Sequence, residues 1–142
     1  MDKLGVSILK ALFLTLIAIL NIFAYEIENR IYKEILLSLY NEKKEIKVWS
    51  NNKNLIKIEP KRIILVKDPK EADILILNKY ENINIEKPIF VTKYHLLKRY
   101  KKIAIGGFYW QKGRPNIVFL KSNLKKFNIN LPKQFHIFVE DL

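Results

Sequence analysis

Residues 103–120 read IAIGGFYWQKGRPNIVFL and carry the clearest structural pattern in this 142-residue chain. Apolar, β-prone residues fill 103–105 and 116–120, and the polar segment Gln111–Arg114 lies between them. Gly113 can adopt a positive φ without steric cost, which a tight reversal between two strands requires. The pattern therefore predicts a β-hairpin whose chain reversal lies at Gln111–Arg114.

Phe108, Tyr109 and Trp110 are three consecutive aromatic residues on the first strand of this hairpin. Successive side chains of a strand point to opposite faces, so the three rings cannot all lie on one side of a sheet. Gly106 and Gly107 come directly before them, and a glycine pair within a strand indicates a bulge or a close approach of neighbouring backbone. These features of the hairpin predict backbone structure and side-chain placement, and they indicate no catalytic chemistry.

The segments before the hairpin alternate between helical and strand-like patterns. Apolar residues recur at i, i+4 spacing over Tyr25–Lys43, which predicts an amphipathic helix with one face packed on a sheet. The continuous apolar run Ile74–Leu77 is typical of a strand that is covered on both faces. Strands are predicted at Glu45–Trp49, Arg62–Lys67, Ile74–Leu77 and Pro88–Thr92, whereas Leu55–Ile58 is ambiguous.

Short helices are expected on both sides of the hairpin. Tyr94–Tyr100 fits about two helical turns, with Leu97 and Tyr100 on one side. After the hairpin, Ser122 is a suitable N-cap for a helix over Asn123–Phe127.

The C-terminal segment predicts a closing helix. Pro132 suits its first turn, and Phe135, Phe138 and Val139 would share one face. Strand-like runs interspersed with helices place the chain in the α/β class. We expect a small single-domain mixed sheet with flanking helices, preceded by an N-terminal hydrophobic signal or anchor helix.

Residues 1–24, MDKLGVSILKALFLTLIAILNIFA, form an apolar leader. The run Ala11–Ala24 is short for a membrane-spanning helix, which needs about 20 residues. It fits the apolar region of a secretory signal, with Ala24 in the small position before the cut. We therefore favour a cleaved signal peptide over residues 1–24 and a single periplasmic α/β domain over residues 25–142. The alternative is an uncleaved inner-membrane anchor that begins near Leu4, with Lys10 snorkelling to the surface.

Two features of the leader keep both alternatives open. Ile22, two residues before Ala24, is larger than the small residue that is usual at that position. Few positive charges precede the apolar run and many follow it, which by the positive-inside rule disfavours a simple anchor with the basic domain outside.

Charge and cysteine content limit the classes of function. The chain has 26 basic and 14 acidic residues, a net charge of +12, and no cysteine. It therefore has no disulfide, no thiolate zinc site and no cysteine nucleophile. Such a charge usually indicates nucleic acid, an anionic membrane or an acidic polymer as partner. All but four of the basic residues are lysine, and isoleucine and asparagine are frequent, so we attribute the charge to AT-rich compositional drift and expect no nucleic-acid partner.

Catalytic, cofactor and metal-binding motifs are not found in the sequence. His95 and His136, the two histidines, lie far apart and without metal-binding spacing. Asp68, Glu71 and Asp73 form an acidic cluster that would suit acid–base work or Mg²⁺, but a turn with exposed charges explains them as well. We therefore expect no enzymatic activity, no cofactor and no metal.

The candidate binding residues are Tyr109, Trp110, Lys112 and Arg114. Cations beside aromatic rings bind anionic or planar ligands by charge and stacking. The structural alternative is a solvated hairpin tip whose aromatic rings are packed beneath it.

The order of the segments resembles the YfiR-like periplasmic family. The matching pieces are ADILIL at 72–77, PIFVT at 88–92, the pair Gly106-Gly107, and the stretch from Gly113-Arg114 to Phe119. The resemblance implies a small α/β fold that restrains a membrane-bound diguanylate cyclase by binding its periplasmic part. This chain differs from some members in lacking cysteine, in a shorter loop after the first strand, and in having Ser122 where an asparagine is expected.

Three functions follow from these observations. The first is a non-enzymatic periplasmic module that binds the outer part of a membrane signalling protein, with buried aromatic and arginine groups supplying the interface energy. The second is a cationic envelope-surface binder of anionic lipid or polymer. The third is a small-ligand sensor with a pocket under the hairpin.

Overall fold

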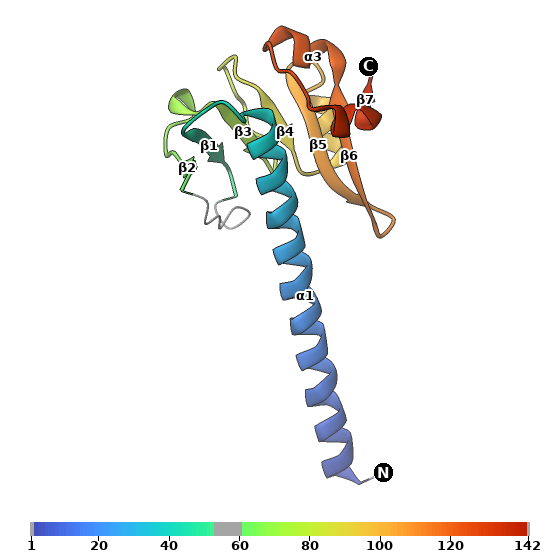
Figure 1. Cartoon of the computed structure of the whole chain (residues 1–142). Coiled ribbons are helices and arrows are strands. Elements are labelled where there is room, and N and C mark those ends of the chain that lie inside the picture. The colour runs from blue at the N-terminus through green and yellow to red at the C-terminus, as the bar shows by residue number, and fades with distance from the viewer. Residues whose placement is uncertain (1, 53–60, 142) are drawn as a thin grey trace.

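One long helix and one mixed sheet dominate the computed structural model, which describes residues 2–52 and 61–141 (Figure 1). Helix α1 runs without interruption from Lys3 to Leu39, so the apolar leader and the amphipathic helix are one element. Asp2 caps it by accepting a hydrogen bond from the backbone N–H of Gly5 at 2.7 Å. The N-terminal half of α1 extends away from the sheet, and its C-terminal end packs on it (Figure 1).

Within the described residues, the sheet has the strand order β2-β1-β3-β4-β5-β6-β7. All neighbouring strands are parallel except β5 and β6, which are antiparallel. The predicted fold class, a mixed α/β sheet with flanking helices behind an N-terminal apolar helix, is confirmed. The strands are β1 (Ile46–Ser50), β2 (Ile63–Leu65), β3 (Ile74–Leu77), β4 (Ile89–Val91), β5 (Ala104–Gln111), β6 (Arg114–Leu120) and β7 (Val139–Glu140).

Strands β5 and β6 form the predicted hairpin, with Gln111 and Arg114 as its last pair. Lys112 and Gly113 make the turn with φ values of 52° and 73°. Positive φ at both central residues is the arrangement of a type I′ turn, whose twist matches that of the flanking strands. The hairpin tip therefore has a defined shape.

Gly106 and Gly107 lie where β5 is crowded by backbone on both sides. A Cβ atom on Gly106 would lie 2.2 Å from the carbonyl oxygen of Val118, and one on Gly107 would lie 2.9 Å from that of Val91. Real Cβ atoms do not come so close to backbone, so both positions need glycine. The predicted close backbone approach is confirmed.

A bulge also occurs at this point. Ile89 pairs with Ala104 but the next residue of β4 pairs with Gly106, so the register skips Ile105. The skip changes which faces the following side chains point to. Phe108 packs in the cluster beneath α1, whereas Tyr109 packs on the opposite face, as the alternation of the aromatic triplet predicts.

The sheet has one apolar cluster on each face. Helix α1 covers the first face through Tyr32, Ile35 and Leu36, and α3 (Lys121–Lys126) and the 3₁₀ helix η2 (Lys133–Phe138) add to this layer. Helix α2 (Tyr94–Arg99) covers the second face. The residues of β3 are buried throughout, as the run Ile74–Leu77 predicts for a strand covered on both sides.

Three local predictions are wrong. Ser122 does not cap α3, because the helix begins one residue earlier at Lys121 and its N-cap is Leu120, which makes no side-chain cap hydrogen bond. The closing segment is a 3₁₀ helix, and Val139 lies in the short strand β7. Helix α1 ends at Leu39 and not at Lys43. The ambiguous segment Leu55–Ile58 lies outside the described residues.

Candidate functional site

The carboxyl ends of the parallel strands β1 to β5 lie together at one end of the sheet. The chain passes from β1 to β2 on one side and then to β3 on the other, so the strand order reverses at β1. In open α/β sheets, ligands bind outside the carboxyl ends of the strands, often near such a reversal. A groove lies at this end of the sheet, over the carboxyl ends of β3, β4 and β5. In Figure 1 these ends lie on the side from which the N-terminal half of α1 leaves.

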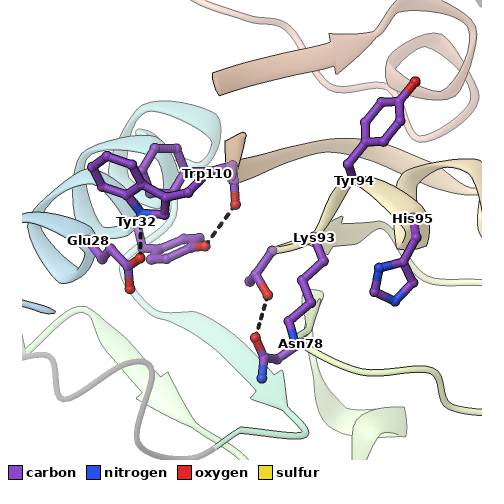
Figure 2. A pocket seen from close by; sticks show the side chains of 9 residues that line it. Glu28, Tyr32, Asn78, Lys93, Tyr94, His95 and Trp110 are labelled. Carbon is purple, nitrogen blue, oxygen red and sulfur yellow. Dashed lines mark hydrogen bonds between the residues drawn. The ribbon is translucent and has the colours of Figure 1, made fainter. Parts of the chain in front are cut away.

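A groove of about 580 Å³ lies at this edge, between α1 and the ends of β3, β4 and β5 (Figure 2). Its volume is in the range of small-molecule sites. We call it the edge groove; its lining residues are Glu28, Tyr32, Asn78, Thr92, Lys93, Tyr94, His95, Phe108 and Trp110.

One wall of the edge groove joins α1 to β5. The indole Nε1 of Trp110 donates a hydrogen bond to Oε1 of Glu28 at 2.6 Å, and the hydroxyl of Tyr32 donates to the carbonyl of Phe108 at 3.2 Å. Burial, together with the charge of Glu28, raises the pKa of Tyr32 well above its usual range, so the phenol stays a neutral donor. Trp110 remains 45 % exposed, so part of its ring is free for contact.

The floor of the groove is a set of short polar contacts between strand ends. The hydroxyl of Thr92 donates to Oδ1 of Asn78 at 2.7 Å, and the backbone N–H of Asn78 donates to Oδ1 of Asn51 at 2.8 Å. These bonds connect the ends of β4, β3 and β1. They fix the positions of polar groups at the edge of the sheet, which preorganises the site.

The opposite wall carries cationic and aromatic side chains. Lys93, Tyr94 and His95 are exposed at the start of α2. The ammonium of Lys98 lies 4.9 Å from the ring centre of Tyr94, which in turn packs on Tyr109 at 5.5 Å. The edge groove thus has the carboxylate of Glu28 and the ring of Trp110 on one wall, and the ammonium of Lys93 and the ring of Tyr94 on the other (Figure 2).

The structure separates the four residues predicted to bind together. Tyr109 is 8 % exposed and lies on the α2 face of the sheet, where burial is the main cause that raises its pKa. Trp110 lies on the α1 face and lines the edge groove. Lys112 and Arg114 are exposed at the hairpin tip and line a separate hollow.

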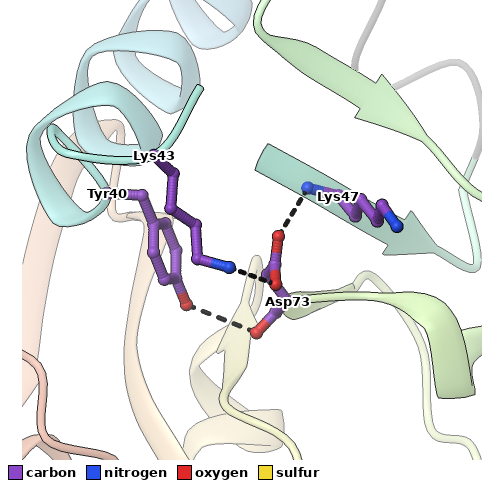
Figure 3. A network of polar contacts seen from close by, with 4 residues as sticks. All are labelled: Tyr40, Lys43, Lys47 and Asp73. Atoms are coloured by element: carbon purple, nitrogen blue, oxygen red, sulfur yellow. Dashed lines mark hydrogen bonds and ion pairs between the residues drawn. The ribbon is translucent and has the colours of Figure 1, made fainter. Parts of the chain in front are cut away.

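The acidic cluster has structural roles. Asp68 caps the 3₁₀ helix η1 (Pro69–Glu71) by accepting from the backbone N–H of Lys70 at 2.9 Å. Asp73 accepts from the ammonium of Lys43 at 2.7 Å and from the backbone N–H of Lys47 at 2.8 Å (Figure 3). Among the described residues, no group of three or more metal-ligating side chains comes together.

Asp73 fastens the end of α1 to the sheet. Its partial burial disfavours the charged form, but the hydrogen bonds from Lys43 and Lys47 and the charges of both lysines outweigh that effect and lower the pKa of the carboxyl. The hydroxyl of Tyr40 also donates to the Asp73 carbonyl at 3.3 Å (Figure 3). The exposed-turn interpretation therefore holds for Asp68 better than for Asp73.

The two histidines lie in different parts of the fold. His95 lines the edge groove, whereas His136 lies in η2, where its Nε2 is 3.1 Å from the carbonyl oxygen of Leu131. Sequence reasoning missed the rest of the groove, above all Glu28, Asn78 and Lys93. The available signal was their position directly after apolar strands or, for Glu28, on the helix face shared with Tyr32.

No protein-family model, curated protein or solved structure matches this chain.

Proposed function

We propose that this chain is an extracytoplasmic, non-enzymatic binding module that regulates a membrane signalling protein by binding its outer part in the edge groove. The observation that carries the proposal is the position of the groove at the end of the sheet from which the apolar half of α1 departs (Figure 1). A partner reaching it from the membrane would meet the half-exposed Trp110, and aromatic anchors of this kind supply much of the energy of interfaces.

The apolar half of α1 supports delivery to a membrane. The large apolar side chains from Leu4 to Phe23 that the structure describes are exposed, and α1 is long and apolar enough to cross a bilayer, a test that a signal sequence also passes. From Leu4 to Ala24 the helix rises about 31 Å at 1.5 Å per residue, close to the thickness of bilayer hydrocarbon. We name Leu4–Ala24 the apolar arm.

We further propose that the apolar arm is retained as an anchor. The helix passes through Ala24 without a break, so in the uncleaved chain the arm and the end of α1 that packs on the sheet are one element. The positive charge that follows the arm does not exclude this topology, because long domains translocate largely regardless of charge. The intact mass of the protein recovered from a membrane fraction tests retention. A chain that begins at Tyr25 would show cleavage and refute the anchor, and binding in the groove would then be tested by crosslinking alone.

The distance between arm and groove favours a partner that is itself in the membrane. Glu28 follows Ala24 by one helical turn, about 6 Å along the axis. A retained arm would hold the edge groove close to the bilayer surface, where the juxtamembrane part of another membrane protein could reach it. The resemblance to the YfiR-like family implies a partner of the same kind.

Site-specific photo-crosslinking tests the proposal. A photoreactive amino acid at Tyr94, which is 42 % exposed in the groove, should capture a protein with transmembrane segments in growing cells. The same probe at Lys102, exposed near the start of β5, is the matched control and should not capture it. Trp110→Ala should abolish the adduct while the purified variant keeps its folded circular dichroism. Equal capture at both positions, or capture unchanged by Trp110→Ala, would refute the groove as the interface.

A small-ligand sensor is the second candidate, and the volume and composition of the edge groove favour it. A carboxylate, an ammonium group and aromatic rings around one cavity suit a small polar ligand with a planar part. A ligand that binds the folded state raises the melting temperature. A thermal-shift screen should give hits whose effect is lost in Trp110→Ala and kept in Lys102→Ala.

A further inference from the structure

The hairpin tip carries a second hollow, separate from the edge groove. It measures about 440 Å³ and is lined by Gln111, Lys112, Arg114 and Asn116. All four side chains offer N–H donors, and two of them are cationic. Among the described residues, neither Lys112 nor Arg114 forms an ion pair. Arginine and lysine on a hollow of amide donors provide the chemistry that binds phosphate oxygens.

The fold determines how far along the α1 axis this hollow lies from the apolar arm. The hydrogen bond from Trp110 to Glu28 places that part of β5 about one helical turn from Ala24. Beyond Trp110 the hairpin continues toward the side on which the arm extends (Figure 1). One further strand residue, Gln111, and the two-residue turn follow Trp110. Together they cover about 3–7 Å, which brings the tip close to the level of Ala24 at the end of the arm.

With the apolar arm in a bilayer, this level is that of the lipid headgroups. Headgroup regions add about 5–8 Å on each side of the hydrocarbon. The half-exposed Trp110, about 6 Å from Ala24 along the helix axis, would lie in the outer part of the headgroup region, and tryptophan is enriched at membrane interfaces. Lysine and arginine near an anionic surface are each attracted to it.

We propose that the hairpin tip binds the phosphate headgroups of anionic membrane lipids through Lys112 and Arg114. This contact fixes the orientation of the sheet relative to the membrane. It thereby holds the edge groove at a constant distance from the bilayer surface. The inference rests on retention of the apolar arm but on no property of the partner. A failed headgroup contact therefore leaves the groove proposal standing, and a failed crosslink leaves the headgroup contact standing.

The test uses the full chain reconstituted in lipid vesicles. Because the chain has no cysteine, Pro115→Cys gives a unique fluorophore site beside the tip, and Lys125→Cys gives one on α3. A spin-labelled headgroup should quench the fluorophore at 115 and not that at 125. Adding phosphatidylglycerol to phosphatidylcholine vesicles should strengthen quenching at 115, and Lys112→Gln with Arg114→Gln should reverse this, weakening the tip–lipid equilibrium on the order of thirty-fold.

A matched charge control separates the tip from the general charge of the chain. Lys101→Gln with Lys102→Gln removes two exposed lysines from the other end of β5 and should leave quenching at 115 unchanged. High salt should weaken the phosphatidylglycerol effect, because exposed charges are screened. Equal quenching at 115 and 125, no response to phosphatidylglycerol, or equal effects of the two double variants would each overturn the proposal.

Discussion

The hydrogen bond between Trp110 and Glu28 should contribute about 1 kcal/mol to the stability of the fold. The donor and acceptor atoms are 2.6 Å apart, and hydrogen bonds to charged groups are worth about 1.5–3 kcal/mol. Trp110 is 45 % exposed, so water competes for the carboxylate and lowers that value. Glu28→Gln keeps a side-chain acceptor but loses the charge, so it should lose about half of the effect.

A double-mutant cycle isolates this contact from the packing of the indole ring. Trp110→Phe removes the donor but retains a ring against Phe108, whose centre lies 6.3 Å from that of Trp110. Combined with Glu28→Ala, the cycle should give a coupling energy of about 1 kcal/mol. Denaturant unfolding of the full chain in mild detergent, followed by near-ultraviolet circular dichroism, measures it.

The control cycle pairs Trp110→Phe with Glu34→Ala, because Glu34 lies on the same helix and is exposed. These two changes should be additive to within about 0.3–0.5 kcal/mol. If the Glu28 cycle is additive to the same degree, the bond does not hold the hairpin against α1. The wall of the edge groove would then depend on Tyr32 alone, and the argument for the level of the tip would fail with it.

Gly106→Ala should lower the free energy of unfolding by more than about 3 kcal/mol, because its Cβ would lie 2.2 Å from backbone. Gly113→Ala, whose Cβ would have nothing within 4 Å, should lower it by only about 1 kcal/mol through positive-φ strain. Similar losses for the two variants in denaturant unfolding would contradict the crowding argument. Asp73→Asn should destabilise the fold by about 1–2 kcal/mol at neutral pH. Because folding lowers the pKa of Asp73, this difference should be complete above the unfolded carboxyl pKa of about 3.9 and should be lost as pH falls from there through the lower pKa of the folded state. A difference that persists in strong acid would refute the assignment to charge. Tyr32→Phe should cost about 1 kcal/mol, and its difference spectrum in alkaline titration should show that Tyr32 does not ionise with exposed tyrosines near pH 10.

The hairpin could be predicted from sequence because its signals are local. A positive-φ glycine at the turn, alternating aromatics and a glycine pair each act within a few residues. The bulge and the close approach at Gly106 and Gly107 are present together, and the structure shows why: the neighbouring strands reach the backbone of β5 on both sides at once.

The C-terminal elements could not be predicted in the same way. Ser122 has good capping chemistry, yet Leu120 takes the N-cap position because β6 continues directly into α3 and buries Leu120 in the sheet. Val139 fits a helical face by spacing, but pairing with Phe119 across the sheet edge draws it into β7. In both cases a long-range contact overrides a local preference.

The edge groove escaped prediction for a different reason. Its residues come from α1, from the ends of three strands and from the start of α2. No sequence motif links these segments, so the sequence does not show that they meet. The hydrogen bond from Trp110 to Glu28 spans 82 positions along the chain. The tip residues Lys112 and Arg114 were predictable as exposed cations. Their separation from Tyr109 follows from their place at the turn, at the far end of the hairpin, and their position relative to the arm follows from α1.

Because α1 is continuous, the two proposed sites, the edge groove and the hairpin tip, are both positioned by the same helix. A helix that passes from the apolar arm into the sheet without a break transmits the orientation of the arm to everything packed on Tyr32 and Leu36. With the arm retained in a bilayer, as proposed, the groove wall at Glu28 and the hairpin tip beyond Trp110 would be positioned relative to the bilayer by the same helix. A flexible linker after Ala24 would give the module reach but no fixed height. A rigid helix gives it a fixed height, which suits a partner whose binding segment leaves the membrane close to the bilayer surface.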